Sequence, residues 1–267
     1  MKIIIVSPYF YPKVGGLEDY VFNLVQGLKN DNSILVITTN HMSTGIVEEN
    51  IKGIRVIRLP ILFKFSNTPI NPLWVWEIKR IIKLEKPDLI NVHTPVPGIS
   101  DIVIMSSGNT PTIFTIHAAT FKKPGFMLFN IVELMYRVIF KYILKKVDAI
   151  IVVPEYVKKS LPEKFLDKVE VVNNAIDLSI IPKKDIQHNK YQLIFIGSLD
   201  KSHSWKGLSD ILIAVSIVKK KYKKVKLVIL GDGDMKEFYE SQAEQLDIVN
   251  NVLFYGFITG AKKYNYV

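Results

Sequence analysis

The sequence predicts an α/β protein with two Rossmann-like, doubly wound parallel-sheet domains in tandem, the second of them incomplete. Two observations carry this prediction. Short runs rich in Val and Ile alternate with stretches whose apolar residues recur at helical spacing, as in parallel sheets covered on both faces. The alternation stops in the polar segment 178–190 and then starts again. We therefore expect a domain at 1–178, a linker at 179–190 and the first half of a second domain at 191–267.

The first domain is expected to contain seven strands, each a run of β-branched and other apolar residues. Behind the first strand, Leu17, Val21, Leu24 and Leu28 share one helical face. In the second domain we expect helices at 207–221 and 235–246. The expected strands are 2–6, 34–39, 54–59, 88–93, 112–117, 148–153 and 169–173, followed by 191–197, 225–231 and 252–257.

Composition narrows the possible partners. The 267 residues include 35 Lys and Arg against 25 Asp and Glu, a net charge of +10, and no Cys. A disulfide scaffold and cysteine metal sites are thereby excluded, and a reducing compartment fits. The basic surplus suits nucleotide phosphates, nucleic acid or an acidic membrane surface. Nucleic acid is disfavoured, because the lysine run at 219–226 contains a single aromatic residue, Tyr222, and no nucleic-acid-binding motif accompanies it.

The pair Gly15 and Gly16 follows the first strand and opens a helix. Ligands of open α/β sheets bind at this carboxyl edge, and glycines let backbone N–H groups approach an anion. Glu18 and Asp19 also suit the positive end of the helix dipole. An anion-binding loop and a simple tight turn both remain open.

Two histidines, His93 and His117, each end an expected strand of the first domain. Carboxyl ends of parallel strands share one edge, so both should point to the edge that holds the glycines. Histidine there can donate a hydrogen bond or carry a proton near neutral pH. A hydrogen-bonded loop histidine is the alternative for each one singly.

The segment 197-GSLDKSHSWKG-207 is the first βα loop of the second domain. Lys206 stands beside the start of the next helix, an arrangement that suits a diphosphate, and Lys201 and His203 could assist. Downstream, Asp232 and Asp234 form a D-x-D pair that could hold a divalent metal, although a βα turn explains it better. Nothing after the first strand reads G-x-G-x-x-G, which disfavours a dinucleotide-dependent epimerase or dehydrogenase.

Together these motifs resemble the retaining glycosyltransferases of family 4, which have the two-Rossmann architecture called GT-B. The resemblance rests on several motifs in order, on both sides of the linker. They are 15-GGLE-18, 115-TIH-117, 174-NAID-177, 195-FIGSLDKSHSWKG-207, 228-VILGDGD-234 and 252-VLFYGF-257.

The resemblance implies transfer of a sugar from a nucleotide-sugar, UDP- or GDP-linked, to an acceptor hydroxyl with retained anomeric configuration. No metal or other cofactor is implied, because fixed positive charge and helix N-termini would stabilise the departing diphosphate. His117 matches the histidine that contacts the donor sugar near its reacting carbon. Glu18 and His93 would face the acceptor. The residues matching donor and phosphate contacts are Gly15, Gly16, Ser198, Lys201, Lys206 and Gly231.

The chain departs from the family pattern in two ways that matter. Ser198 stands where most relatives have an arginine. Neutralisation of the diphosphate's negative charge would then depend on Lys206, helped by Lys201. Relatives are also expected to continue for roughly a hundred residues beyond Val267, enough for the other half of a doubly wound sheet. The sequence is therefore interpreted as a fragment of an enzyme, with a catalytically silent binding subunit as the alternative.

The expected acceptor is a glycan or lipid-linked acceptor, as in the synthesis of cell-surface polysaccharide or glycolipid. The stretch 126–147 is apolar but carries Asn130, Glu133 and several cations, so we expect no transmembrane span there. Its apolar face and basic flanks, with the lysines of 219–226, favour peripheral contact with an anionic membrane, and a buried core helix is the alternative. We expect a cytoplasmic protein, in contact with the inner face of that membrane.

Overall fold

The computed structural model describes residues 1–40, 44–65, 68–94, 98–118, 127–175, 178, 181, 190–258 and 260–266. The chain divides into two compact units, Met1–Ala175 and Ile176–Val267. Each unit has its own sheet and its own hydrophobic core. Most of the expected linker, 179–190, lies outside the described residues.

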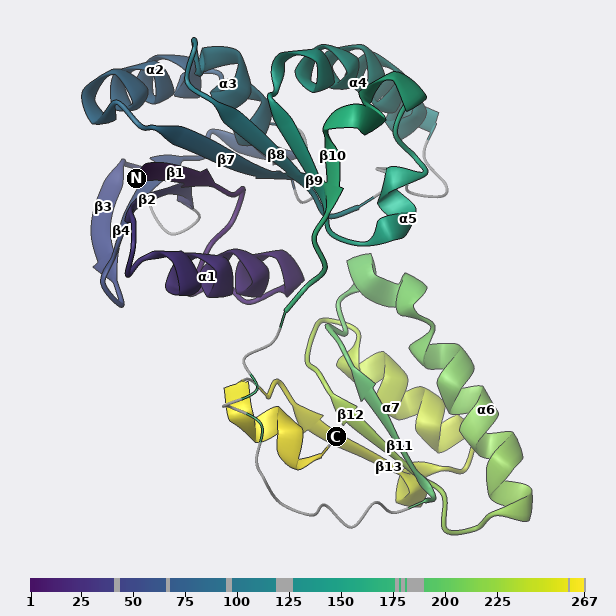
Figure 1. The fold of residues 1–267 in the computed structure, drawn as a ribbon. Helices are drawn as coiled ribbons and strands as arrows, with labels where there is room; N and C mark the ends of the chain where they lie inside the picture. The colour runs from purple at the N-terminus through teal and green to yellow at the C-terminus, as the bar shows by residue number, and fades with distance from the viewer. Residues whose placement is uncertain are drawn as a thin grey trace. The chain divides into compact units, whose positions relative to one another are not determined.

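The first unit is built on an eight-stranded sheet in the order β10-β9-β8-β7-β1-β2-β4-β3 (Figure 1). Every neighbouring pair in it is parallel except β3 and β4. A separate antiparallel hairpin, β5 with β6, follows β4. The strands are β1 (Lys2–Val6), β2 (Ser33–Asn40), β3 (Val47–Ile51), β4 (Ile54–Pro60), β5 (Phe63–Phe65), β6 (Thr68–Ile70), β7 (Leu89–Thr94), β8 (Thr112–Ile116), β9 (Ala149–Val152) and β10 (Val169–Val171).

Helices cover both faces of this sheet, as the continuous apolar strands require. Because side chains alternate along a strand, Ile4 of β1 packs into the core under α2, α3 and α4, whereas Ile5 packs into the core over α1 (Figure 1). The helices are α1 (Gly16–Leu28), α2 (Trp74–Glu85), α3 (Ile99–Ser106), α4 (Met127–Lys146) and α5 (Glu155–Lys158), with the 3-10 helix η1 (Glu163–Lys168) before β10.

All seven strands expected in the first unit are present, with ends that differ by one or two residues. Strand β3 was not expected, because two glutamates and an asparagine among its five residues disfavour a strand. Side-chain pairs to β4 compensate for this composition. Glu49 pairs with the buried Arg58, and Glu48 pairs with Arg55 at 2.5 Å.

The second unit contains a three-stranded parallel sheet in the order β11-β12-β13, and α6 and α7 pack on one face of it (Figure 1). Its core joins Ile229 of β12 to Leu212 of α6 and Tyr239 of α7. The expected strand–helix alternation is confirmed. The elements are β11 (Gln192–Ile196), η3 (Lys201–Lys206), α6 (Leu208–Lys221), β12 (Lys226–Leu230), α7 (Lys236–Gln245), η4 (Val249–Asn251), β13 (Val252–Gly256) and η5 (Gly260–Asn265).

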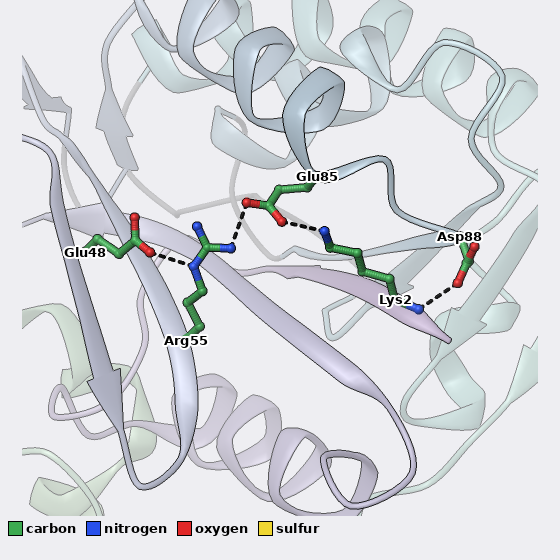
Figure 2. Close-up of polar contacts among 5 residues, drawn as sticks. All are labelled: Lys2, Glu48, Arg55, Glu85 and Asp88. Atoms are coloured by element: carbon green, nitrogen blue, oxygen red, sulfur yellow. Dashed lines mark hydrogen bonds and ion pairs between the residues drawn. The ribbon is translucent and has the colours of Figure 1, made fainter.

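The amino edge of the first sheet is held by a chain of ion pairs (Figure 2). Glu85, at the end of α2, accepts from Lys2 of β1 and from Arg55 of β4, each at 2.7 Å. The amide N–H of Lys2 donates to Asp88 at 2.7 Å. A cavity of about 250 Å³ lies at this edge, lined in part by these charges and by Lys29. It is at the opposite end of the strands from the candidate site residues.

Candidate active site

Two histidines meet at the carboxyl edge of the first sheet. Strands β7 and β8 are parallel neighbours, and the backbone N–H of His117, directly after β8, donates to the carbonyl oxygen of Thr94 at 3.2 Å. This brings Nδ1 of His93 to 3.1 Å from Nε2 of His117. The two expected site histidines therefore form one hydrogen-bonded pair.

The two imidazoles differ in exposure. His117 is partly exposed, whereas the side chain of His93 has no exposed surface. Ser100 of α3 donates its hydroxyl to the carbonyl oxygen of His93 at 2.7 Å, which fixes the backbone there. The side chain of His93 is therefore covered and contacts His117, and its expected place on the acceptor side stays a prediction.

Burial keeps both rings neutral at physiological pH. It lowers the pKa of His117 from 6.5 to about 4. Burial, and then the neighbouring His117, lower the pKa of His93 well below its usual value. Neutral imidazoles each have one N–H donor and one bare nitrogen acceptor. The pair can therefore orient a hydrogen bond toward a ligand, but near pH 7 it does not supply a positive charge.

Tyr20 completes this cluster and was not predicted. Its ring meets His117 edge-on, with centroids 4.7 Å apart, and lies 5.7 Å from the ring of His93. A signal was present in the sequence: Tyr20 is four residues after Gly16, so one helical turn places both on the same side of α1. The helix that begins at the glycine pair thus packs directly against the histidine pair.

The space beside the first glycine of the pair, Gly15, is filled by a side chain of the helix that the pair opens. The carboxyl of Glu18 folds back over Gly15, and its carbon lies 3.1 Å from the position of a β-carbon on Gly15. A side chain at Gly15 would collide with this carboxylate, whereas the space beside Gly16 is open. Glu18 is 8% exposed, and its burial raises its pKa. The space beside Gly15 is therefore filled by the Glu18 carboxyl, which the sequence did not reveal.

In the second unit, Lys206 lies over the end of β11. Its Nζ is 3.1 Å from the position of a β-carbon on Gly197, directly after the strand. Gly207 has φ of 75°, in the left-handed region, which lets η3 pass into α6 at this point. Among the described residues Lys206 forms no ion pair, so its charge is available to an anion.

The rest of the loop 197–207 is held by acidic side chains. The Ser198 hydroxyl donates to Asp200 at 2.6 Å, and the backbone N–H of Lys201 donates to Asp234 at 2.7 Å. His203 lies 3.8 Å from Asp200. Ser198 and Asp234 therefore shape the loop, and the side chains of Lys201 and Lys206 remain the cations beside it.

Two glycines allow the neighbouring strand ends to meet. A β-carbon on Gly231, after β12, would collide with the carbonyl oxygen of Gly197. A β-carbon on Gly233 would lie 2.5 Å from the backbone nitrogen of Asp200. Gly231 is therefore required for close packing of the backbone beneath the loop that carries Lys206.

Both aspartates of the D-x-D pair accept hydrogen bonds from backbone N–H groups. Asp234 accepts from Lys201, and Asp232 accepts from the N–H of Gly233 at 2.9 Å. The described part of the chain contains no cluster of three or more His, Cys, Asp or Glu residues that could hold a metal ion. These contacts support the interpretation of 231–234 as a βα turn.

No helix in the described ranges is long and apolar enough to cross a membrane. The exposed side of α4 nevertheless carries apolar side chains, with Val138 72% and Tyr142 55% exposed. Lys141 and Lys145 are exposed on the same helix.

Comparison with known proteins identifies the family on both units. The model of Glycosyltransferase Family 4 matches residues 14–180, and that of Glycosyl transferases group 1 matches residues 178–267. An uncharacterized glycosyltransferase of Methanocaldococcus jannaschii is 27% identical over 273 residues, which cover 100% of this chain and 68% of that protein. The O-antigen chain mannosyltransferase C of Escherichia coli is 24% identical, with 99% of this chain and 69% of that protein covered.

Solved structures agree on the fold. The structure of S. aureus TarM superposes with a TM-score of 0.63 at 14% identity, over 96% of this chain and 77% of that one. This likeness extends over both units, and it confirms the GT-B class that the sequence motifs implied. The chain belongs to Glycosyltransferase Family 4, and it is a transferase enzyme that acts on sugars.

Proposed function

We propose that this glycosyltransferase moves a sugar from a nucleotide-sugar to an acceptor hydroxyl and retains the anomeric configuration. One observation carries the proposal: Lys206 lies over Gly197 at the carboxyl edge of β11 and has no acidic partner among the described residues. An unpaired ammonium beside closely packed glycine backbone suits the diphosphate of such a donor.

The roles follow from the two separate clusters. Lys206, with Lys201 nearby, would stabilise the negative charge that develops on the leaving diphosphate. His117, neutral and partly exposed, would hydrogen-bond the donor sugar. Glu18 is the nearest carboxylate to the glycine pair, where its raised pKa suits a hydrogen bond with an acceptor hydroxyl.

No metal ion takes part in the proposed reaction, because Lys206 would supply the positive charge that a cation supplies elsewhere. UDP and GDP are the proposed nucleotides. The TarM structure contains UDP together with glycan ligands, which supports a uridine nucleotide and a glycan acceptor. The name of the E. coli relative, an O-antigen chain mannosyltransferase, supports a surface polysaccharide as the product.

We also propose that the protein contacts an anionic membrane from the cytoplasmic side. Exposed Val138 and Tyr142 lie on one side of α4 with Lys141 and Lys145, the combination of apolar and basic side chains that binds a lipid interface. A lipid-linked acceptor would then be reached at the membrane surface.

The experiment is a transfer assay with UDP- and GDP-sugars and a mixture of glycan and lipid acceptors, with and without EDTA. Nuclear magnetic resonance of the product gives the anomeric configuration of the new bond. The proposal predicts an α-linked product from an α-linked donor and an unchanged rate with EDTA. An inverted product would refute retention, and complete loss of transfer with EDTA would refute metal independence.

A further inference from the structure

The contact between His93 and His117 leaves one question of chemistry, namely which ring carries the shared proton. Each neutral imidazole has a single N–H, so one ring donates and the other accepts. Either His93 donates from Nδ1, or His117 donates from Nε2. The two arrangements present different atoms of His117 to a ligand.

The surroundings of His93 decide between them. Its Nε2 is buried and has no hydrogen-bond partner among the described residues. If His93 accepted at Nδ1, its only proton would be on this Nε2, as a buried N–H without an acceptor. Orphaned buried N–H groups are rare in folded proteins, and an under-satisfied acceptor is tolerated more often. The arrangement in which His93 donates from Nδ1 avoids the orphaned donor.

The tautomer of His117 then follows from the hydrogen bond that its Nε2 accepts from His93. With its Nε2 taken as acceptor, its own proton is on Nδ1. Among the described residues Nδ1 of His117 has no hydrogen-bond partner, and it is not among the buried unpaired atoms. The Tyr20 ring packs edge-on against the imidazole at 78°, with the centroids 4.7 Å apart.

We propose that His93 is a positioning residue, which donates Nδ1–H to Nε2 of His117 and so holds His117 in the tautomer that offers an Nδ1–H donor to an oxygen of the donor sugar. The sugar contact rests on the proposed function, whereas the tautomer does not. A bound hydroxyl or ring oxygen would find a fixed donor that costs no reorganisation on binding.

The direct test is the ¹⁵N spectrum of the histidine side chains in the full chain at pH 7. Protonated and bare ring nitrogens resonate in separate regions, and His117→Gln identifies the His117 signals among the five histidines. The proposal predicts a proton on Nδ1 of His117 and on Nδ1 of His93. A proton on Nε2 of His117, or a mixture of both tautomers, would overturn it. No substitution at His93 is needed for this result.

Two matched variants test positioning. In His93→Asn the amide nitrogen takes the place of Nδ1 and can still donate, whereas His93→Leu has nearly the same shape and no donor. Loss of one neutral hydrogen bond predicts a turnover about fivefold lower in His93→Leu and largely restored in His93→Asn. The tautomer of His117 should become mixed only in His93→Leu. Equal turnover and equal spectra in both variants would reject the positioning role.

The two claims fail separately. If no nucleotide-sugar binds or reacts and the spectrum still shows the expected tautomer, the proposed function is wrong and the hydrogen-bond assignment stands. If sugar transfer is present and the spectrum shows the other tautomer, the assignment is wrong and the function stands.

Discussion

The ammonium nitrogen of Lys206 lies 3.1 Å from the position that a β-carbon would take on Gly197. The lysine side chain therefore occupies the space that any larger residue at 197 would need. Because Gly197 directly follows β11, this contact holds a positive charge at the carboxyl edge of the second sheet.

Substitution of Gly197 should disturb binding more than folding. In Gly197→Ala the new methyl group meets the flexible side chain of Lys206 and lies 3.4 Å from Cε1 of Phe195, an ordinary contact distance. The free energy of unfolding should therefore change by less than about 1 kcal/mol. The displaced ammonium should weaken UDP or GDP binding by roughly two- to tenfold. Calorimetric titration and urea unfolding measure the two effects.

Gly231→Ala is the contrasting variant. Its methyl group would collide with the backbone carbonyl of Gly197, which has no side-chain freedom to move away. Overpacking of this kind costs about 1–3 kcal/mol, visible as a lower urea midpoint. Equal stability of both alanine variants would contradict the packing described for the two strand ends.

Two buried groups of the first unit, His117 and Asp101, should change its stability in opposite directions as the pH falls. Below pH 6.5 an unfolded chain takes up a proton at His117, whereas the folded chain resists until about pH 4, so this group makes stability fall as pH falls. Burial raises the pKa of Asp101 from 3.8 to about 6, so the folded chain binds that proton first and stability rises as pH falls from 6. Each effect amounts to about 3 kcal/mol.

Single variants separate these two responses. In Asp101→Asn the amide can still accept from Gly98 and donate to Tyr136, the two partners of the carboxylate. Its stability between pH 7 and pH 4 should therefore fall more steeply than that of the natural chain, and that of His117→Gln should fall less steeply. Urea unfolding at several pH values measures the slopes, and parallel curves for all three proteins would refute both pKa shifts.

The ion-pair chain at the amino edge of the first sheet is expected to stabilise it (Figure 2). Glu85 is 12% exposed and joins Lys2 to Arg55, so Glu85→Gln should cost about 1–2 kcal/mol. Hydrogen bonds from Lys2, and then from Arg55, lower the pKa of Glu85. Its contribution is therefore present above the ordinary pKa of 4.5 and lost as the pH falls through the lower folded value.

Glu77→Gln on the same helix is the control for this prediction. Its pair with Arg80 is a surface i,i+3 pair, which contributes less than about 0.5 kcal/mol. If Glu77→Gln lowers the urea midpoint as much as Glu85→Gln does, Glu85 has no special role.

Membrane contact should depend on the exposed side of α4. Replacement of Val138 and Tyr142 by Ser removes apolar area without disturbing the buried face, which includes Ile143. The natural chain should sediment with vesicles of anionic lipid at low salt, and the double variant should sediment several-fold less. Equal sedimentation of both proteins, or none by the natural chain, would exclude this surface.

The fold was largely predictable because parallel strands buried on both faces leave long Val and Ile runs in the sequence. Strand β3 was not predicted, because its stability comes from side-chain pairs with β4 and not from the strand propensity of its own residues. The edge of the sheet that holds His93 and His117 could also be inferred, since each histidine ends an expected strand and parallel strands share one carboxyl edge. Their burial could not, because it comes from tertiary packing: Tyr20 of α1, a helix distant in sequence, lies against both rings. The fold of Glu18 over Gly15 likewise needs coordinates, since the same carboxylate could equally extend into solvent.

The most direct measurement of the central claim is release of nucleoside diphosphate from UDP- and GDP-sugars in the presence of acceptor, followed by ³¹P resonance. Three variants are compared with the natural chain: His117→Ala, Lys206→Ala and, as control, Lys226→Ala at the opposite end of β12. The account predicts release that falls at least tenfold without His117 or Lys206, the effect of losing a charged or substrate hydrogen bond, and stays unchanged without Lys226. Release that is equal in all four proteins, or absent with every donor, would contradict it.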